Sequence, residues 1–288
     1  MPPGPKAIRT ATVCVATLVS ACASAEGIDT EHLFGFMIGT DVGGVGEREL
    51  QSRTTGRFSK DGGHYRAINH ELELEFVPVR NLRIELGSSL AAHDISGVAG
   101  LEDRNHLVWQ GASIDLRYRV LDRNTTPMGL TVAVEGHLNR IQENSAAAVR
   151  NYGTEFTLAF DRELVPNFAV AALNLTFQPE WTRFSGAGLS EQESTIGAAF
   201  GIMAQIAPGV LVGGETRYVR KYEGIGLQEF AGEAVFVGPT AYFQLSKRSR
   251  LTAAWSFQAW GRSPQSAMAL DLLNFERSQA RLVFGVNF

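Results

Sequence analysis

The sequence has little cysteine and no long apolar run after its N-terminal end. Its two cysteines, Cys14 and Cys22, both lie within the first 25 residues. If that stretch is removed, neither disulfides nor thiolate metal sites can hold the fold. No apolar segment of 18 residues follows, whereas a membrane-spanning helix needs about 20. These absences exclude a disulfide scaffold and a helical membrane protein.

The chain also lacks an excess of positive charge. The formal net charge is −4, with 26 Lys and Arg against 30 Asp and Glu. A protein that binds nucleic acid would carry a basic surface, so we expect no nucleic-acid partner. We find no glycine-rich phosphate loop and no Gly-Xaa-Ser-Xaa-Gly elbow, and we expect neither cofactor nor metal.

The first 25 residues have the pattern of a secretory signal peptide. Lys6 and Arg9 precede an apolar stretch that is too short to span a bilayer, and Ala23-Ser24-Ala25 supplies small residues for cleavage after position 25. An alternative is lipoprotein processing, with Cys22 as the lipidated residue. Either route predicts export, with residues 26–288 as a single domain.

Alternation of apolar and polar residues dominates the remainder of the chain. A period of two places successive side chains on opposite faces of a strand, and segments of 10–16 residues exceed the usual length of strands in soluble proteins. Such strands, when tilted, match the apolar band of an outer-membrane barrel. The predicted strands are 33–43, 66–77, 82–93, 107–121, 128–140, 150–161, 168–183, 193–206, 210–222, 233–245, 251–262 and 277–288.

The connections between these segments alternate between short turns and longer polar loops. Five short turns and six long loops, of which 44–65 is the first, require twelve strands with both termini on the short-turn side. Outer-membrane barrels have short periplasmic turns and longer extracellular loops. A soluble β-sandwich shares the period of two, but it does not explain the signal peptide, strand length and loop asymmetry together.

The last strand carries the most specific pattern. Apolar residues occupy alternate positions from Ala280 to Phe288, and the chain ends on that aromatic residue. This ending resembles the C-terminal strand of bacterial outer-membrane β-barrels. The whole pattern resembles Gram-negative, porin-like channel proteins of the outer membrane. The resemblance implies an all-β, antiparallel up-and-down barrel that contacts outer-membrane lipid and is recognised by the barrel-assembly machinery through Phe288. A homo-oligomer is a further possibility.

The polar face of a barrel lines its lumen, and here that face is rich in charge. Ten predicted lumenal carboxylates against five Arg or Lys favour a passive channel for small hydrophilic solutes with weak cation preference. The alternative is an occluded structural or adhesin-like barrel whose charges brace one another. The predicted pore-lining residues are Glu71, Glu73, Glu75, Arg83, Glu85, Asp115, Arg117, Arg119, Glu135, Glu155, Glu215 and Arg217.

Catalysis is not expected. No histidine is followed two residues later by serine, the pairing found in barrel phospholipases and deacylases, and only His93-Asp94 suggests an acid–histidine pair. The segment 266–275 is unusually apolar for an exposed loop, and we expect it to form a short helix in the mouth or to contact a neighbouring barrel.

Overall fold

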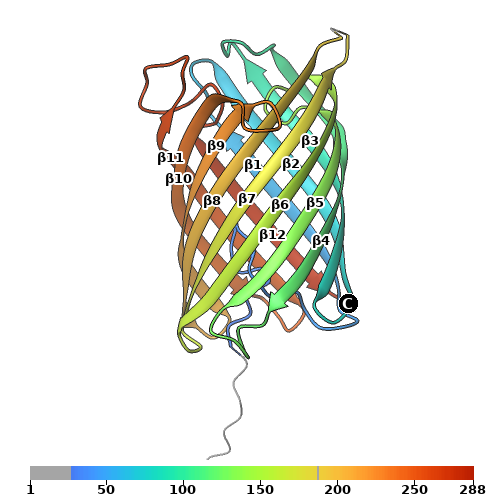
Figure 1. Ribbon diagram of the computed structural model, residues 1–288, viewed down its shortest axis with the longest axis vertical. Helices are drawn as coiled ribbons and strands as arrows, with labels where there is room; N and C mark the ends of the chain where they lie inside the picture. The colour runs from blue at the N-terminus through green and yellow to red at the C-terminus, as the bar shows by residue number, and fades with distance from the viewer. Residues whose placement is uncertain (1–26, 187) are drawn as a thin grey trace, which may run out of the picture.

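The computed structural model describes residues 27–186 and 188–288, and it is a closed, antiparallel β-barrel (Figure 1). The predicted signal peptide and its cleavage site lie outside the described residues. The strands are β1 (Arg48–Phe58), β2 (His64–Val79), β3 (Leu82–Ser96), β4 (Arg104–Leu121), β5 (Gly129–Ile141), β6 (Ala148–Val165), β7 (Ala169–Phe184), β8 (Ser190–Ala207), β9 (Val210–Glu223), β10 (Glu229–Gln244), β11 (Ser249–Arg262) and β12 (Ser278–Asn287).

Each strand pairs with its neighbours in sequence, and β12 returns to β1 to complete the ring. The closing pair runs from Glu49 opposite Asn287 to Phe58 opposite Ser278. The final residue takes part, since Phe288 N–H donates to the Arg48 carbonyl over 3.0 Å. Closure leaves no strand with an unpaired edge, which a lipid environment requires. The predicted all-β barrel, its twelve strands and the closing role of the last strand are confirmed.

The predicted division into two faces is also confirmed. Leu74 and Leu158 are 41% and 43% exposed on the exterior, whereas Glu73 is only 3% exposed on the lumenal side. The same alternation continues around the barrel and builds an apolar outer band. Aromatic residues lie near its two rims: Trp109, Trp181 and Trp260 at one, Phe168 and Phe288 at the other, all exposed. This is the girdle that membrane barrels place at the lipid–water boundary.

The first predicted strand, 33–43, is wrong. These residues form no strand, and the true first strand, β1, lies inside the predicted loop 44–65. The error has a physical cause. Residues 33–38 are apolar because they are buried inside the barrel, and the outward positions of β1 include Ser52, Thr54 and Gly56, which look like a loop.

The loops differ in length from the prediction, although the number of turns and loops is right. Connections at the end that holds the termini have two to four residues, such as Arg80-Asn81 and Pro208-Gly209, except for the seven-residue turn 122–128. At the other end, five of the six loops have only five to seven residues, and 263–277 is the single long one. We orient the terminal end toward the periplasm, as in other outer-membrane barrels. Both termini of the described chain lie at the lower end in Figure 1.

The β2–β3 register differs by two residues from the symmetric turn that the sequence favours. A three-residue turn at 78–80 predicts Glu73 opposite Glu85. The actual turn has Asn81 with φ of 68°, and a bulge follows Phe76, so that Glu75 is opposite Glu85. A shift of two keeps every side chain on its predicted face.

The described residues contain no helix long and apolar enough to cross a membrane.

The face assignment predicts opposite outcomes for two substitutions on β6. Leu158→Arg places a charge in the lipid band at a cost of roughly 2–4 kcal/mol and should lower the yield of heat-modifiable, folded barrel in liposomes. Glu155→Gln changes a lumenal residue on the same strand and should fold with the yield of the unaltered protein. Equal yields for the two variants would contradict the assignment.

Candidate functional site

A segment before the first strand enters the barrel from the periplasmic end. We call residues 27–47 the plug. It runs into the lumen, turns at 34–37 and returns to the start of β1 (Figure 1). Its two limbs lie so close that a Cβ on Gly39 would overlap the Thr30 carbonyl oxygen. Glycine at position 39 therefore permits the narrow hairpin-like path that fits inside the barrel.

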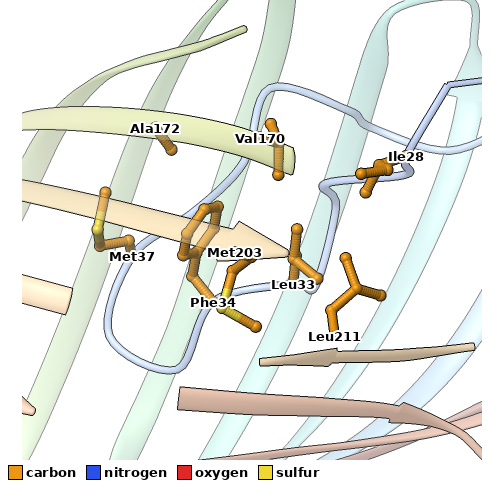
Figure 2. Packing of buried hydrophobic residues seen from close by; sticks show 8 residues of the cluster. All are labelled: Ile28, Leu33, Phe34, Met37, Val170, Ala172, Met203 and Leu211. Atoms are coloured by element: carbon orange, nitrogen blue, oxygen red, sulfur yellow. The ribbon is translucent and has the colours of Figure 1, made fainter. Parts of the chain in front are cut away.

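The plug's apolar side chains pack against the lumenal wall. Figure 2 shows Leu33, Phe34 and Met37 facing side chains from the surrounding strands. The wall contributes Val170 from β7 and Met203 from β8, both fully buried. This patch gives the lumen a small hydrophobic core near its periplasmic end, which accounts for the apolar character that made 33–43 resemble a strand.

A buried carboxylate on β6 clamps the two limbs together. Asp161 accepts from the Thr40 backbone N–H at 2.9 Å, from Thr40 Oγ1 at 2.7 Å and from Thr30 Oγ1 at 2.5 Å. Arg123, in the turn before β5, pairs with Asp161 at 3.0 Å and with Asp41 of the plug at 2.5 Å. Each limb is thus bonded to the same acidic group.

The tip of the plug is held by a second carboxylate, on β9. Glu215 accepts from the backbone N–H groups of Gly35 at 2.7 Å and Phe36 at 2.8 Å. Asn174 on β7 exchanges two hydrogen bonds with the backbone of Ile38, at 2.8 and 2.9 Å. The tip makes no strand pairing, so these side chains supply the partners that its buried backbone needs.

Two arginines enclose the ring of Phe36. The guanidinium carbon of Arg217 lies 4.0 Å from the ring centroid, and that of Arg281 lies 4.7 Å away. Arg281 donates to Thr55 Oγ1 and to the Gly35 carbonyl, and Arg217 donates to Ser256 and Gln279. Among the described residues, neither arginine has a carboxylate within ion-pair distance. The plug tip therefore rests on two cations that carry no acidic partner.

Beyond the plug, the lumen opens into a polar chamber of about 540 Å³. Its floor is the plug, from Glu31 to Ile38, and its outer end is bounded by residues 142–144 and 274–276 of two loops. Nearly all strands contribute polar side chains to its wall. Nine carboxylates and eight Arg or Lys residues line it, so the charges almost balance.

A row of carboxylates runs obliquely across six neighbouring strands. Cross-strand pairing places each acid directly opposite the next, so the like charges need cations nearby. Three arginines supply them: Arg250 pairs with the first acid, Arg83 with the second and third, and Arg117 with the third and fourth. The acids, in order from β1 to β6, are Glu49, Glu75, Glu85, Asp115, Glu135 and Glu155.

The row ends on two acids that lack such compensation. Glu135 and Glu155 are directly opposite on β5 and β6. Within the described residues neither has an arginine or lysine within 4.0 Å, and Glu155 accepts a hydrogen bond from Thr157 Oγ1 at 3.1 Å. Both face the chamber. They are therefore the acids of the row that no neighbouring arginine or lysine neutralises.

Every predicted pore-lining residue lies on the lumenal side, but the structure divides them into two groups. Seven line the chamber: Glu71, Arg83, Asp115, Arg117, Glu135, Glu155 and Arg217. The other five are enclosed: Glu73, Glu75 and Glu85 lie among the arginines, Arg119 pairs with Asp41 near the periplasmic end, and Glu215 holds the plug.

Sequence reasoning missed the plug and the cations of β1 and β12. Arg53 pairs with Glu71 at 2.8 Å and with Glu73 at 2.6 Å, yet it lay in a predicted loop. Arg281 lies inside the correctly predicted last strand, where the alternation of Arg281 with Leu282 already placed it on the lumenal face. A count of the charged residues on the lumenal face of the last strand would therefore have included it.

Some of the acidic groups are also close enough together to hold a metal ion, but a buried arginine is paired with them. Oxygen or nitrogen atoms of Glu31, His32 and Glu75 lie within 4.8 Å of one another. Arg83 is 1% exposed and pairs with Glu31 at 2.5 Å and with Glu75 at 3.4 Å. Its guanidinium supplies the positive charge, so the geometry fits an ion-pair network.

The suspected His93-Asp94 pair does not form. His93 is buried and its Nε2 lies 2.8 Å from the Glu143 carbonyl. Asp94 points to the other face, where it contacts His64 at 3.0 Å and Arg66 at 3.1 Å.

The segment 266–275 contains no helix, contrary to expectation, but Phe275 does pack in the mouth against Phe236, with ring centroids 6.3 Å apart.

The chain belongs to a family of unknown function, DUF6662, whose model matches residues 26–288. No curated protein matches the sequence. Among solved structures, the COG4313 outer membrane channel from Pseudomonas putida F1 is similar, with a TM-score of 0.59, 13% identity, and coverage of 86% of this chain and 98% of that one. The translocator domain of the autotransporter NalP from Neisseria meningitidis has a TM-score of 0.48, 14% identity, and coverage of 86% and 91%.

The fold is that of an outer-membrane β-barrel. The closed ring, the apolar exterior and the aromatic rims are suited to a bilayer and not to water. The protein is thus a barrel of the bacterial outer membrane, porin-like in architecture, with a charged lumen and an internal plug.

The clamp makes a prediction about plug mobility. Asp161→Ala removes the acceptor shared by Thr30 and Thr40 and leaves Arg123 with one acidic partner fewer. The plug should become more exposed, so that a single cysteine introduced at Met37, which is buried in the plug, reacts faster with a maleimide added on the periplasmic side. Arg162→Gln, next to Asp161 on β6 but with its side chain exposed on the exterior, is the matched control and should leave the rate unchanged.

Proposed function

We propose that the protein is a passive channel for small hydrophilic solutes, closed at rest by its own plug. The observation that supports this most strongly is the polar chamber of about 540 Å³ inside a membrane-spanning barrel. A barrel needed only as a scaffold could fill its lumen with side chains, as narrow barrels do. Here charged and amide groups surround a volume large enough for a small solute.

The plug is the barrier in this proposal. It forms the chamber floor, and hydrogen bonds and ion pairs at the clamp and the tip hold it beside the apolar patch. When the tip withdraws into water, these contacts are replaced by bonds to solvent, at a net cost of about 1.5–3 kcal/mol for each hydrogen bond to a charged group. Passage then requires the tip to withdraw, while the barrel wall stays intact.

Conductance in planar bilayers tests this proposal. Protein lacking residues 27–43 should give larger and longer-lived openings than the unaltered chain. Refolded protein must first show the heat-modifiable band of an intact barrel. Absence of current after plug removal would refute the channel.

Weak cation preference is the second part of the proposal. The lining acids outnumber the basic residues by only one, so the preference should be smaller than the ten-to-five ratio of the sequence indicated. It should arise mainly from Glu135 and Glu155, because the other acids of the row are neutralised by arginines. A chamber wall of one sign concentrates counter-ions, and salt screens the effect within about 10 Å at 0.1 M.

Reversal potentials across a salt gradient measure that preference. In the plug-deleted protein, Glu135→Gln/Glu155→Gln should abolish or invert the cation preference, and the preference of the parent should fade as salt rises. Glu102→Gln, in an outer loop with 77% of its side chain exposed, should leave the reversal potential unchanged. An anion preference in the parent would contradict the assignment of these two acids.

An occluded structural barrel is the alternative, and the number of plug contacts is the feature that favours it. An adhesin-like role has less support, because five of the six outer loops have seven residues or fewer and offer little surface. We infer no catalytic role, since His93 and Asp94 have separate partners.

Two partners complete the proposal. We infer that the barrel-assembly machinery recognises β12 and its terminal Phe288, as the resemblance of this ending to other barrels implies. Truncation of Phe288 should slow assembly in cells more than it destabilises the refolded barrel. We also propose that the apolar exterior mediates self-association, which cross-linking in native membranes would detect.

A further inference from the structure

Three neighbouring strands each place an outward-facing arginine at the extracellular rim. Arg140 is near the end of β5, Arg150 is near the start of β6 and Arg183 is near the end of β7. All three are exposed. The strands lie side by side in the barrel wall (Figure 1). The three cations therefore form one row on its outer surface.

The row includes an unfavourable pair. Arg150 and Arg183 are directly opposite in the β6–β7 register. Directly opposite residues of an antiparallel pair have Cβ atoms about 4.5–5.5 Å apart, and like charges there are destabilising. In the described part of the chain, none of the three arginines has a carboxylate within 4.0 Å. The lumenal cations Arg53, Arg83 and Arg117, by contrast, all have acidic partners.

The position of the row indicates what offsets this repulsion. Two residues nearer the membrane centre, the same strands expose Tyr152 and Trp181, and Arg140 lies over the ring of Trp109 at 5.5 Å from its centroid. Such aromatic residues mark the lipid–water boundary. Two residues of strand span about 7 Å, which puts the guanidinium groups at the depth of the lipid headgroups.

We propose that Arg140, Arg150 and Arg183 form a binding site for phosphate groups of an outer-leaflet glycolipid. Guanidinium binds phosphate through two parallel, charge-assisted hydrogen bonds, and adjacent arginines can share the oxygens of one group. The acyl chains of the same lipid would lie against the apolar exterior below the aromatic residues. A lipid phosphate fits better than a free one, because both the cationic row and the apolar band below it then have partners. This inference does not depend on whether the lumen conducts.

The test uses the full-length protein, extracted from outer membranes in mild detergent and freed of bound lipid. Thermal unfolding is measured as the loss of the heat-modifiable band. The measurement is repeated at increasing concentrations of bisphosphorylated lipid A, of the same lipid without phosphates, or of inorganic phosphate. The unaltered protein should gain stability with bisphosphorylated lipid A only. Arg150→Gln/Arg183→Gln should bind that lipid at least tenfold more weakly. Arg162→Gln, an exposed arginine on β6 at the opposite rim, should behave as the unaltered protein.

The sign of a second measurement separates binding from a structural role. In detergent without lipid, Arg183→Gln removes one of two repelling charges, so its unfolding temperature should equal or exceed that of the unaltered protein. Arg183→Lys should retain part of the response to lipid A. The proposal is overturned if Arg183→Gln unfolds at a lower temperature without lipid, if the dephosphorylated lipid stabilises equally, if inorganic phosphate alone reproduces the effect, or if Arg162→Gln loses the response as well.

Discussion

The fold depends on one constraint: within lipid, every backbone N–H and C=O group must find a partner in the protein. A sheet meets this requirement only by closing on itself, and here β12 meets β1 to do so. Closure in turn fixes the side chains, because a period of two leaves one face against lipid and the other in the lumen. Charged residues are excluded from the lipid band and gather inside. Their crowding creates the six-acid row and the arginines that neutralise most of it.

Most strands could be predicted from the sequence because this constraint determines whether each position is apolar or polar. In β2, leucine at 72 and 74 alternates with glutamate at 71 and 73. In a membrane, only one arrangement suits this pattern: the leucines face lipid and the glutamates face the lumen. The first strand escaped detection because Ser52 and Thr54, in the middle of its outward face, weaken the apolar alternation. The plug, by contrast, is apolar for a reason that a period cannot reveal, since its apolar side chains pack against the lumenal wall.

Register and ion pairing were less accessible from the sequence. A two-residue shift at the turn Arg80-Asn81 places Glu85 opposite Glu75 instead of opposite Glu73, and every side chain keeps its face of the sheet. Alternation determines which face of the sheet each side chain occupies, whereas the register between two strands depends on the geometry of the turn. Which arginine meets which acid depends on that register and on strands distant in sequence, as with Arg250 and Glu49. The candidate residues could therefore be identified, but their division into chamber wall and ion-pair network could not.

The plug and the chamber act on one another through the same side chains. Arg217 and Arg281 line the chamber, have no acidic partner in the described structure, and enclose Phe36 at the plug tip. On the opposite wall, Glu135 and Glu155 are acids without a basic partner. The uncompensated charges of the lumen thus lie apart, positive at the plug tip and negative across from it. The guanidinium groups that line the chamber are therefore the same ones that hold the plug tip. A change at either arginine alters the chamber wall and the plug contacts together, with no change needed in the strand pairing.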